Sequence, residues 1–329
     1  MKKIRIFLAL LFAAGAGFGG GSAMAQDPAA GYPNRPLRFI VPYPPGALTD
    51  VLARVIGERL ATALKQPVVV ENRAGAGTLI GADLVAKAAP DGYTLLMATS
   101  TTLGISPAIY SKPAIDAVKD FAAVSLVGSV NFFLVTSPSL GAKSVAELID
   151  LVRRNPGKFN YASSGSGSPH HLFMEVFKKE LGLNVQHVPY KGSALAVLDM
   201  IAGKPEMMFL DFSVAVPNIQ GGKITALGTS AAVQSVLMPN VQPVARTVPG
   251  FDWQAWQGVV ATGGTPRAIV ARLNAEMQRF QATPEFRDQL VKFGMEPWAP
   301  NTPEQFAEIV KTDVGRWAGV VKAAGLKVD

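Results

Sequence analysis

Short apolar runs rich in β-branched residues alternate with helical patterns along almost the whole chain. The apolar runs predict strands, and apolar positions that recur at helical spacing between them predict helices. The regular order of strand, helix and strand indicates parallel sheets covered by helices. Strands are predicted at residues 37–41, 68–70, 94–98, 131–135, 158–162, 185–188, 207–210, 224–228 and 258–261, and helices at 51–60, at 79–88, from 145, from about 169 and through most of 266–324.

The first 25 residues have a pattern of their own. Basic residues at positions 2, 3 and 5 precede an apolar run at 6–14, and small residues follow up to Ala25. This order is typical of a secretory signal peptide, so we expect export and cleavage after Ala25. No later segment approaches the roughly 18 consecutive apolar residues of a membrane span, so we expect no membrane anchor in the exported chain.

Composition narrows the class of protein. A length of 329 residues predicts about two domains, each with a core of its own. The absence of cysteine excludes disulfides, thiolate nucleophiles and cysteine metal sites. An exported chain without cysteine fits the bacterial periplasm, and a eukaryotic secreted protein without disulfides is the alternative. The net charge of +7 falls to +4 without the leader, and only 17% of the residues are charged, which argues against nucleic-acid binding.

Residues 41–50 form the first candidate binding loop. Prolines stiffen the exit from the strand, Gly46 allows an unusual backbone angle, and a helix is expected to begin at Thr49 or Asp50. Ligands bind at the carboxyl ends of parallel strands, and the free N–H groups of a helix start suit an anion. The alternative interpretation is that Thr49 and Asp50 only cap the helix.

Residues 161–170 form a second loop of the same kind, enriched in serine and glycine. Serine hydroxyls can donate to a carboxylate, while glycines let the backbone approach a ligand closely. The order of residues does not provide the G-x-S-x-G of a hydrolase nucleophile, and a flexible linker is the alternative. The loop therefore predicts anion binding through Ser163, Ser164, Ser166 and Ser168, with Gly165 and Gly167 beside them.

Other motifs are weaker. The glycines of 75–81 have a dinucleotide-like spacing, but residues 71–73 separate them from the preceding strand, so we expect no cofactor. The three histidines, His170, His171 and His187, lack metal-ligand spacing, so we expect no metal site, with His170 near a helix start and facing the cleft. Tyr190 begins a turn that could bring Lys191 to a ligand, and a solvated lysine is the alternative. No pattern pairs a nucleophile with a base, which predicts no catalytic residue.

Taken in order, several phrases of the chain closely resemble the substrate-binding receptors of tripartite tricarboxylate transporters, also called Bug proteins. The resemblance extends from about Tyr32 to Asp329. Each phrase alone is weak, and their joint order is specific. The phrases are those at residues 32–36, 41–50, 69–73 with 75–77, 89–94, 160–164, 188–192 and 264–266 with 271–274.

The resemblance implies a type II periplasmic-binding-protein fold of the α/β class, with two Rossmann-like lobes joined by two hinge crossings. Lobe 1 is expected at residues 26–126 plus 231–329, and lobe 2 at 127–230 as an insertion. The ligand implied is a small carboxylate, held between the lobes and bound on the first lobe partly through water. The ligand-binding residues expected from the resemblance and from the loops are Tyr43, Gly46, Ala47, Leu48, Thr49, Asp50, Ser100, Thr101, Ser163, Ser164, Gly165, Ser166, Ser168, His170, Tyr190 and Asp211.

Two departures from the family pattern bear on the ligand. Ala47 replaces the second glycine of the first loop, and its methyl group is expected to narrow the site or restrict the loop. Phe212 beside Asp211 favours a ligand with an apolar or aromatic body, and Asp211 would repel a carboxylate unless it binds an amine or a hydroxyl.

The function implied is an extracytoplasmic receptor that captures a small organic acid and delivers it to the permease subunits of a tripartite tricarboxylate transporter. By the same resemblance the protein is expected to be a periplasmic monomer. Two alternatives stay open: a sensory accessory that presents its ligand state to a membrane histidine kinase, and an exported hydrolase that uses the serine loop. Monocarboxylates, dicarboxylates, aromatic acids and amino acids all remain candidate ligands.

Overall fold

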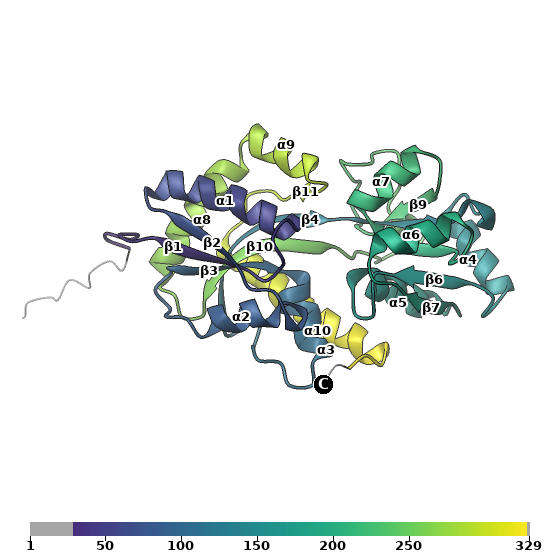
Figure 1. The fold of residues 1–329 in the computed structure, drawn as a ribbon, viewed down its shortest axis with the longest axis horizontal. Coiled ribbons are helices and arrows are strands. Elements are labelled where there is room, and N and C mark those ends of the chain that lie inside the picture. Colours follow the sequence, from purple (N-terminus) through teal and green to yellow (C-terminus); the bar gives the residue numbers. More distant parts are fainter. Residues whose placement is uncertain (1–28, 328–329) are drawn as a thin grey trace, which may run out of the picture.

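The computed structural model describes residues 29–327, and the predicted signal peptide lies outside this range. Two α/β bodies lie side by side along the long axis of the molecule, with strands passing between them (Figure 1). The two-lobed α/β fold predicted from the sequence is therefore confirmed. Within residues 29–327, no helix combines the length and apolarity needed to cross a bilayer.

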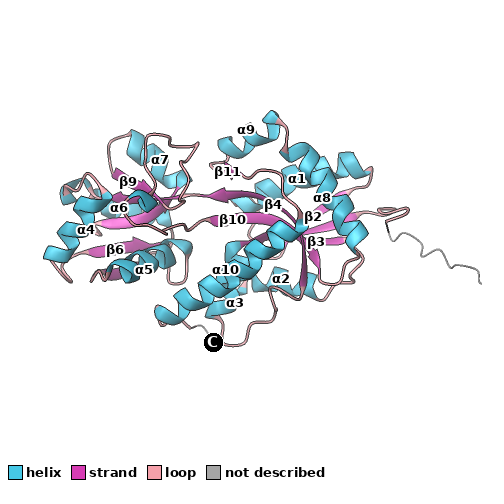
Figure 2. Cartoon of the chain, turned by 180° about the vertical axis from the view of Figure 1, so that it is seen from behind, coloured by secondary structure: helices cyan, strands magenta, loops and turns pink. Residues whose placement is uncertain are grey.

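The first body is built on a six-stranded sheet in the order β11-β4-β10-β3-β1-β2. Helices cover both of its faces (Figure 2). Strand β3 has every residue buried, as expected for a strand sandwiched between helix layers. The strands are β1 Leu37–Val41, β2 Val68–Asn72, β3 Thr94–Thr99, β4 Phe121–Val130, β10 Ala255–Thr262 and β11 Glu296–Pro297, and the helices are α1 Leu48–Leu64, η1 Ala76–Thr78, α2 Leu79–Ala86, η2 Thr101–Ile105, α3 Ser106–Ile109, α8 Arg267–Gln281, α9 Pro284–Lys292 and α10 Pro303–Ala323.

The second body is built on a five-stranded sheet in the order β7-β6-β8-β5-β9. Its strands are β5 Phe132–Thr136, β6 Asn160–Ser163, β7 Gln186–Pro189, β8 Met207–Asp211 and β9 Thr225–Thr229. Its helices are η3 Pro138–Leu140, α4 Val145–Arg154, α5 Pro169–Leu181, α6 Ser193–Ile201 and α7 Phe212–Gln220. Residues 230–254, with the short helix η4 Val244–Arg246, then lead back to β10 in the first sheet.

Both sheets are mixed, so the expectation of parallel sheets holds for only part of each: β1 pairs in parallel with β2 and β3, and β6 with β7 and β8. Strand β10 runs antiparallel to β3 and β4, and β5 runs antiparallel to β8 and β9. The chain leaves the first sheet along β4 and returns to it along β10, so these neighbouring strands run in opposite directions. The lobe boundaries at 127 and 230 remain a prediction, since the second sheet itself extends from Phe132 to Thr229.

One hydrophobic cluster of residues within 29–327 extends from one body to the other. The indole of Trp317 on α10 stacks on Phe173 of α5, with ring centroids 5.8 Å apart, and lies 4.8 Å from the ring of Trp253. Ile109 of α3 belongs to the same buried cluster. Helix α10 therefore packs against the first sheet with part of its length and against the second body with its last turns (Figure 1).

Candidate ligand-binding site

A cavity of about 880 Å³ lies between the two bodies and receives residues from both of them. Three helices, α1, α5 and α7, begin at this cavity, and their N-cap residues Ala47, Ser168 and Asp211 all line it. The lining consists of Tyr43, Ala47, Leu48, Thr49, Val51, Gly77, Thr78, Thr99, Ser100, Thr101, Val130, Phe132, Ser168, Pro169, His170, Asp211, Phe212, Ser213, Ala255, Trp256, Gln257, Phe293 and Gly294.

The first loop brings backbone N–H groups to the cavity. Helix α1 begins at Leu48, one residue before the expected start, and no side chain caps it. The N–H groups of a first helical turn have no acceptor within the helix, so those at Leu48 and Thr49 are available to an anion. Ala47 has an ordinary extended conformation (φ −66°, ψ 156°), so its methyl group does not strain the loop, whereas Gly46 adopts φ +81°.

Asp50 does not line the cavity, because its carboxylate holds the loop from behind. It accepts hydrogen bonds from the backbone N–H of Gly46 (2.9 Å) and from Asn72 Nδ2 (2.8 Å), and it pairs with Arg54. Burial raises the pKa of Asp50, but the hydrogen bonds from Arg54, Gly46 and Asn72 outweigh burial, and the pKa lies below its ordinary value. Gly46 lies outside the lining as well. We interpret both residues as supports of the loop.

The end of β3 supplies hydroxyl groups to the same wall. Tyr43 Oη and Thr99 Oγ1 are 3.0 Å apart, and Thr99 Oγ1 also accepts the backbone N–H of Thr102 at 3.1 Å. Burial raises the pKa of Tyr43, which keeps its phenol neutral. Ser100 and Thr101 line the cavity as expected from the sequence, and the Ser100 hydroxyl is buried without a hydrogen-bond partner in the described protein.

Thr78 and Gln257 are among the lining residues that were missed from the sequence. Thr78 Oγ1 and Gln257 Oε1 are also buried and unpaired. Thr78 adopts φ +82°, a left-handed angle that is unfavourable for a β-branched residue and is found mainly where a site needs it. The glycines of 75–77, judged unsuited to a dinucleotide, were the available signal for this turn; Gln257 on β10 had none.

The second body contributes a carboxylate paired with an imidazole. Asp211 Oδ2 lies 3.0 Å from His170 Nε2, and Asp211 Oδ1 accepts from Ser213 Oγ at 2.6 Å. His170 Nδ1 lies 2.8 Å from the hydroxyl of Ser164, so both ring nitrogens have protein partners. Burial raises the pKa of Asp211, but the contacts with His170 and Ser213 outweigh burial and hold the pKa well below its ordinary value. Asp211 is therefore an anion at neutral pH.

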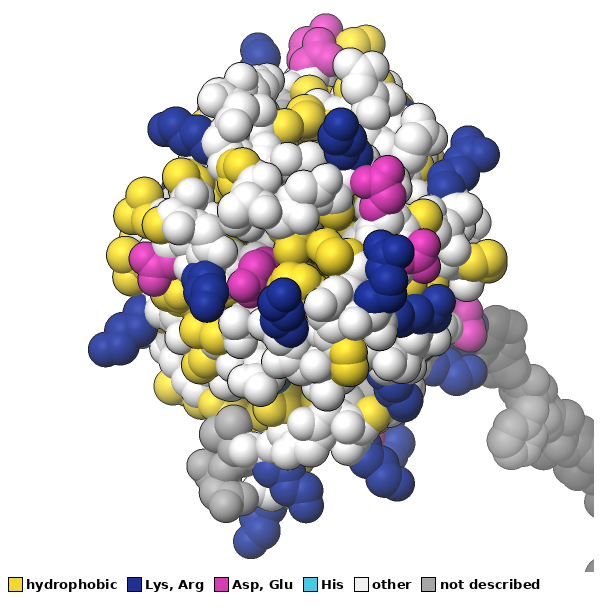
Figure 3. Space-filling view, turned by 90° about the vertical axis from the view of Figure 1, so that its right-hand side faces the viewer, with side chains coloured by type: hydrophobic (Ala, Val, Ile, Leu, Met, Phe, Trp, Pro, Cys, Tyr) yellow, Lys and Arg dark blue, Asp and Glu magenta, His cyan; other side chains and the backbone are white. Residues whose placement is uncertain are grey.

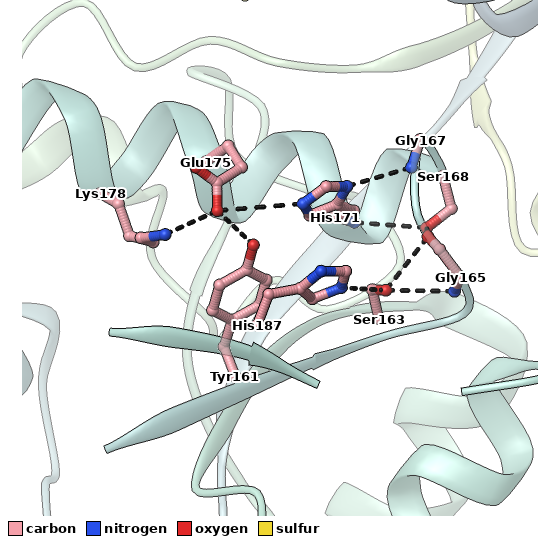
Figure 4. Close-up of polar contacts among 9 residues, drawn as sticks. All are labelled: Tyr161, Ser163, Gly165, Gly167, Ser168, His171, Glu175, Lys178 and His187. Atoms are coloured by element: carbon pink, nitrogen blue, oxygen red, sulfur yellow. Dashed lines mark hydrogen bonds and ion pairs between the residues drawn. The ribbon is translucent and has the colours of Figure 1, made fainter. Parts of the chain in front are cut away.

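Most of the serine-rich loop lies outside the cavity lining, and polar contacts around it hold it in place (Figure 4). Of its serines, only Ser168 lines the cavity, and it caps α5 by accepting the His171 N–H at 3.3 Å. Ser163 Oγ lies 2.7 Å from His187 Nε2 and accepts the backbone N–H of Gly165 at 3.1 Å. Ser164 orients His170, and neither Gly165 nor Ser166 is part of the lining.

Two stacked imidazoles anchor this loop. The rings of His171 and His187 are nearly parallel, 7° apart, with centroids separated by 3.9 Å (Figure 4). His171 Nδ1 accepts the backbone N–H of Gly167 at 3.0 Å, which places the ring proton on Nε2. The Glu175 carboxylate accepts from Lys178 at 2.6 Å and from the Tyr161 hydroxyl. Burial lowers the pKa of both histidines, so the stacked pair is neutral at pH 7.

Tyr190, the remaining residue of the predicted site, lies outside the cavity lining. Its hydroxyl donates to Asp199 at 2.9 Å, and its ring is partly buried against the hydrophobic core of the second body. The sequence indicated that a strand ends just before Tyr190, but it did not indicate which neighbours the Tyr190 side chain contacts.

Aromatic rings fill the space between the polar walls. Phe132 meets the His170 ring edge-on, with centroids 4.9 Å apart. Phe212 of the second body lies against Gly294 of the first, where an added Cβ would come within 2.2 Å of the Phe212 ring. None of the described residues that line the cavity is Lys or Arg. The cavity thus suits a ligand with an apolar body whose polar groups are met by N–H groups, hydroxyls and one carboxylate.

The rest of the described chain supplies no competing chemistry of this kind. Residues 29–327 contain no group of three His, Asp or Glu side chains arranged to hold a metal ion. At the end of the second body, Lys and Arg side chains are spread over the surface between hydrophobic and uncharged ones (Figure 3). That face therefore presents no continuous basic surface.

Comparisons with known proteins agree with this architecture. The sequence profile of the TctC family, described as the tripartite tricarboxylate transporter family receptor, matches residues 52–326. BugT of Bordetella pertussis is 36% identical over 303 residues, which are 90% of this chain and 91% of BugT. The structure of Rpa4515 of R. palustris with adipate has 32% identity and a TM-score of 0.74, covering 90% of this chain and 99% of that one.

MatC of Rhodopseudomonas palustris, solved with bound malate, is similar to the same extent. It has 32% identity and a TM-score of 0.71, covering 88% of this chain and 100% of MatC. The family match spans most of the sequence, and the fold and the cavity between two lobes agree with it. The chain belongs to the TctC family of tripartite tricarboxylate transporter receptors, which are periplasmic solute-binding proteins.

Proposed function

We propose that this protein is a periplasmic receptor that binds a small organic acid between its lobes and delivers it to the membrane subunits of a tripartite tricarboxylate-type transporter. The observation that carries the proposal is the convergence of the starts of α1, α5 and α7 on one cavity lined by both lobes. Relatives solved with adipate and malate support the choice of a carboxylate ligand.

In this proposal the first lobe binds a carboxylate of the ligand. The N–H groups of Leu48 and Thr49 and the hydroxyls of Thr78, Ser100 and Thr101 donate hydrogen bonds to this carboxylate. A hydrogen bond to a charged group contributes about 1.5–3 kcal/mol, so several of them account for a micromolar Kd, which corresponds to about −8 kcal/mol. No guanidinium or ammonium group is then needed.

The remaining predicted residues form two groups in this proposal. The first group lines the cavity and contacts the ligand; it consists of Tyr43, Ala47, Ser168, His170 and Asp211. By contrast, the residues behind the lining hold the loops in place: Gly46, Asp50, Ser163, Ser164, Gly165 and Ser166.

Ligand capture is proposed to proceed by hinge closure about the two crossings near Val130–Phe132 and residues 230–254. Contacts of the second lobe with the first stabilise the closed arrangement. Phe212 packs on Gly294, and an added Cβ on Gly167 would come within 2.8 Å of Ile109. These close approaches leave no room for the lobes to approach further at either point.

The cellular context follows the family. Export by the N-terminal leader with cleavage after Ala25, a periplasmic location, a monomeric receptor and the absence of any catalytic or cofactor role all belong to the proposal. The predicted lobes, 26–126 with 231–329 and 127–230, are the moving bodies.

The first test is a thermal-shift screen of the exported protein, unfolded and refolded to remove carried-over ligand. A ligand at 100 times its Kd adds about 2.7 kcal/mol of stability, which a melting curve resolves. Stabilisation confined to carboxylates is expected, together with loss of uptake of the same acid when the gene is deleted. Stabilisation by non-acids alone, or by no compound across a broad panel, would contradict the proposal.

A further inference from the structure

The two walls of the cavity differ in what they offer to a ligand. The first-lobe wall presents mainly donors, namely the N–H groups at the start of α1 and the unpaired hydroxyls of Thr78 and Ser100, with Gln257 Oε1 as one unpaired acceptor beside them. The starts of α5 and α7 also lie at the second-lobe wall, but the side chains of Ser168 and Asp211 cap them. This wall presents an acceptor, the Asp211 carboxylate, whose side chain is 20% exposed. A ligand that bridges the walls therefore needs different groups at its two ends.

His170 does not reverse this polarity. Its Nε2 is engaged by Asp211 at 3.0 Å and its Nδ1 by Ser164 at 2.8 Å, so neither nitrogen is left to bind an anionic ligand group. Lys and Arg are absent from the described lining. A carboxylate placed at the second-lobe wall would meet Asp211 in an apolar cavity, where like charges repel more strongly than in water.

The space between the walls selects an apolar body. Phe132, Phe212, Trp256 and Phe293 line it, and aromatic rings favour flat or aliphatic groups over hydrated ones. A ligand with charges or hydroxyls along its length would lose water there without gaining hydrogen-bond partners. A donor at its far end, in contrast, reaches Asp211.

We infer that the ligand is a monocarboxylate with an apolar or aromatic body and a hydroxyl or amino group at its far end, and that Asp211 selects it against dicarboxylates. The carboxylate binds at the start of α1, and the distal donor binds the Asp211 carboxylate. This inference rests on the proposed receptor function and names its ligand class.

Two series of matched acids test it by calorimetry on the ligand-free exported protein. The six-carbon series is hexanoate, 6-hydroxyhexanoate, 6-aminohexanoate and adipate, and the aromatic series is benzoate, 4-hydroxybenzoate, 4-aminobenzoate and terephthalate. In at least one series the donor-ended acids are expected to bind about tenfold or more tighter than both the unsubstituted acid and the diacid, as for one charge-assisted hydrogen bond gained.

The variant Asp211→Asn removes the charge and keeps a good N-cap for α7. The affinity for the amine-ended acid divided by the affinity for the diacid is expected to fall about tenfold in this variant. Asp199→Asn removes a carboxylate charge at an exposed position of the same lobe outside the cavity lining, and it is expected to leave the order of ligands unchanged. If Asp211→Asn does not fold, as judged by circular dichroism, the order of ligands in the unmodified protein decides.

The outcomes distinguish failure of the inferred ligand class from failure of the receptor function. Diacids that bind as tightly as the donor-ended acids, or a ratio of the two affinities that Asp211→Asn leaves unchanged, would overturn the inference while the receptor function stands. Failure of every acid in both series and in the broader panel would overturn the receptor function itself.

Discussion

Acidification should loosen the second lobe through His187, whose pKa is lowered from 6.5 to about 4. Burial is the main cause, and the neighbouring His171 ring, 3.9 Å away, adds to it. The negative charge of Glu175 raises the pKa of His187, and the positive charge of Lys178 lowers it. Protonation of His187 would place a charge against the stacked ring and against Ser163, which shares the loop behind the cavity.

The sign and size follow from proton linkage. Folded His187 binds a proton less readily than unfolded His187. The folded protein therefore has its full stability above pH 6.5 and loses part of it as the pH falls from 6.5 towards 4. At 1.36 kcal/mol for each pKa unit, the loss at pH 5 is about 2 kcal/mol at full strength. Because the ring is half-buried and solvent screens its charge, we expect about 1 kcal/mol.

The comparison of the protein with His187→Gln isolates this effect, because Gln can donate to Ser163 and does not titrate. Groups other than the coupled His171 titrate alike in both proteins and cancel in the difference between their melting temperatures, so the difference reports His187 together with its effect on His171. The melting temperature of the variant minus that of the unmodified protein should be about 2 °C larger at pH 5 than at pH 7.5. An equal difference at the two pH values would refute the reasoning.

Three further perturbations have defined outcomes. Ser100→Ala removes a buried, unpaired hydroxyl, so melting should be unchanged while calorimetry shows about tenfold weaker carboxylate binding; equal affinity would remove Ser100 from the site. Trp317→Ala empties a buried contact between the lobes and should cost about 3–5 kcal/mol of stability in denaturant unfolding, with a loss below 1 kcal/mol contradicting the role of α10. Gly294→Ala would place its Cβ 2.2 Å from the Phe212 ring, so small-angle scattering should show less compaction on ligand binding, partly restored by Phe212→Leu. Full compaction of Gly294→Ala would show that this contact does not limit closure.

Much of the secondary structure could be predicted because it depends on local order in the sequence. Strand β1 was predicted with the bounds that the structure has, and α5 begins at Pro169 as its Ser-Pro start indicated. The strand-loop-helix order around both candidate loops was also predicted, and the loops after β1 and β6 each supply residues to the cavity lining. These features need only neighbouring residues to form.

The direction of individual side chains could not be predicted in the same way. Asp50 and Ser163 occupy predicted binding loops, but each binds its own loop from behind. Trp256, Gln257 and Phe293 line the cavity although they are more than 150 residues distant in sequence from the first loop. No local pattern marks them, because their place depends on the return of the chain to the first sheet along β10.

The sequence by itself determined the two α/β lobes, the family and the loops at which a ligand would be sought, because each depends on periodicity or on local motif order. Tertiary structure alone decided the chemistry of the cavity. It paired His170 with Asp211, left Thr78 and Ser100 without partners and directed no Lys or Arg of the described lining into the site. The physical reason is that the charge and hydrogen-bonding capacity of a side chain within a site depend on which partners folding brings within about 3 Å of it.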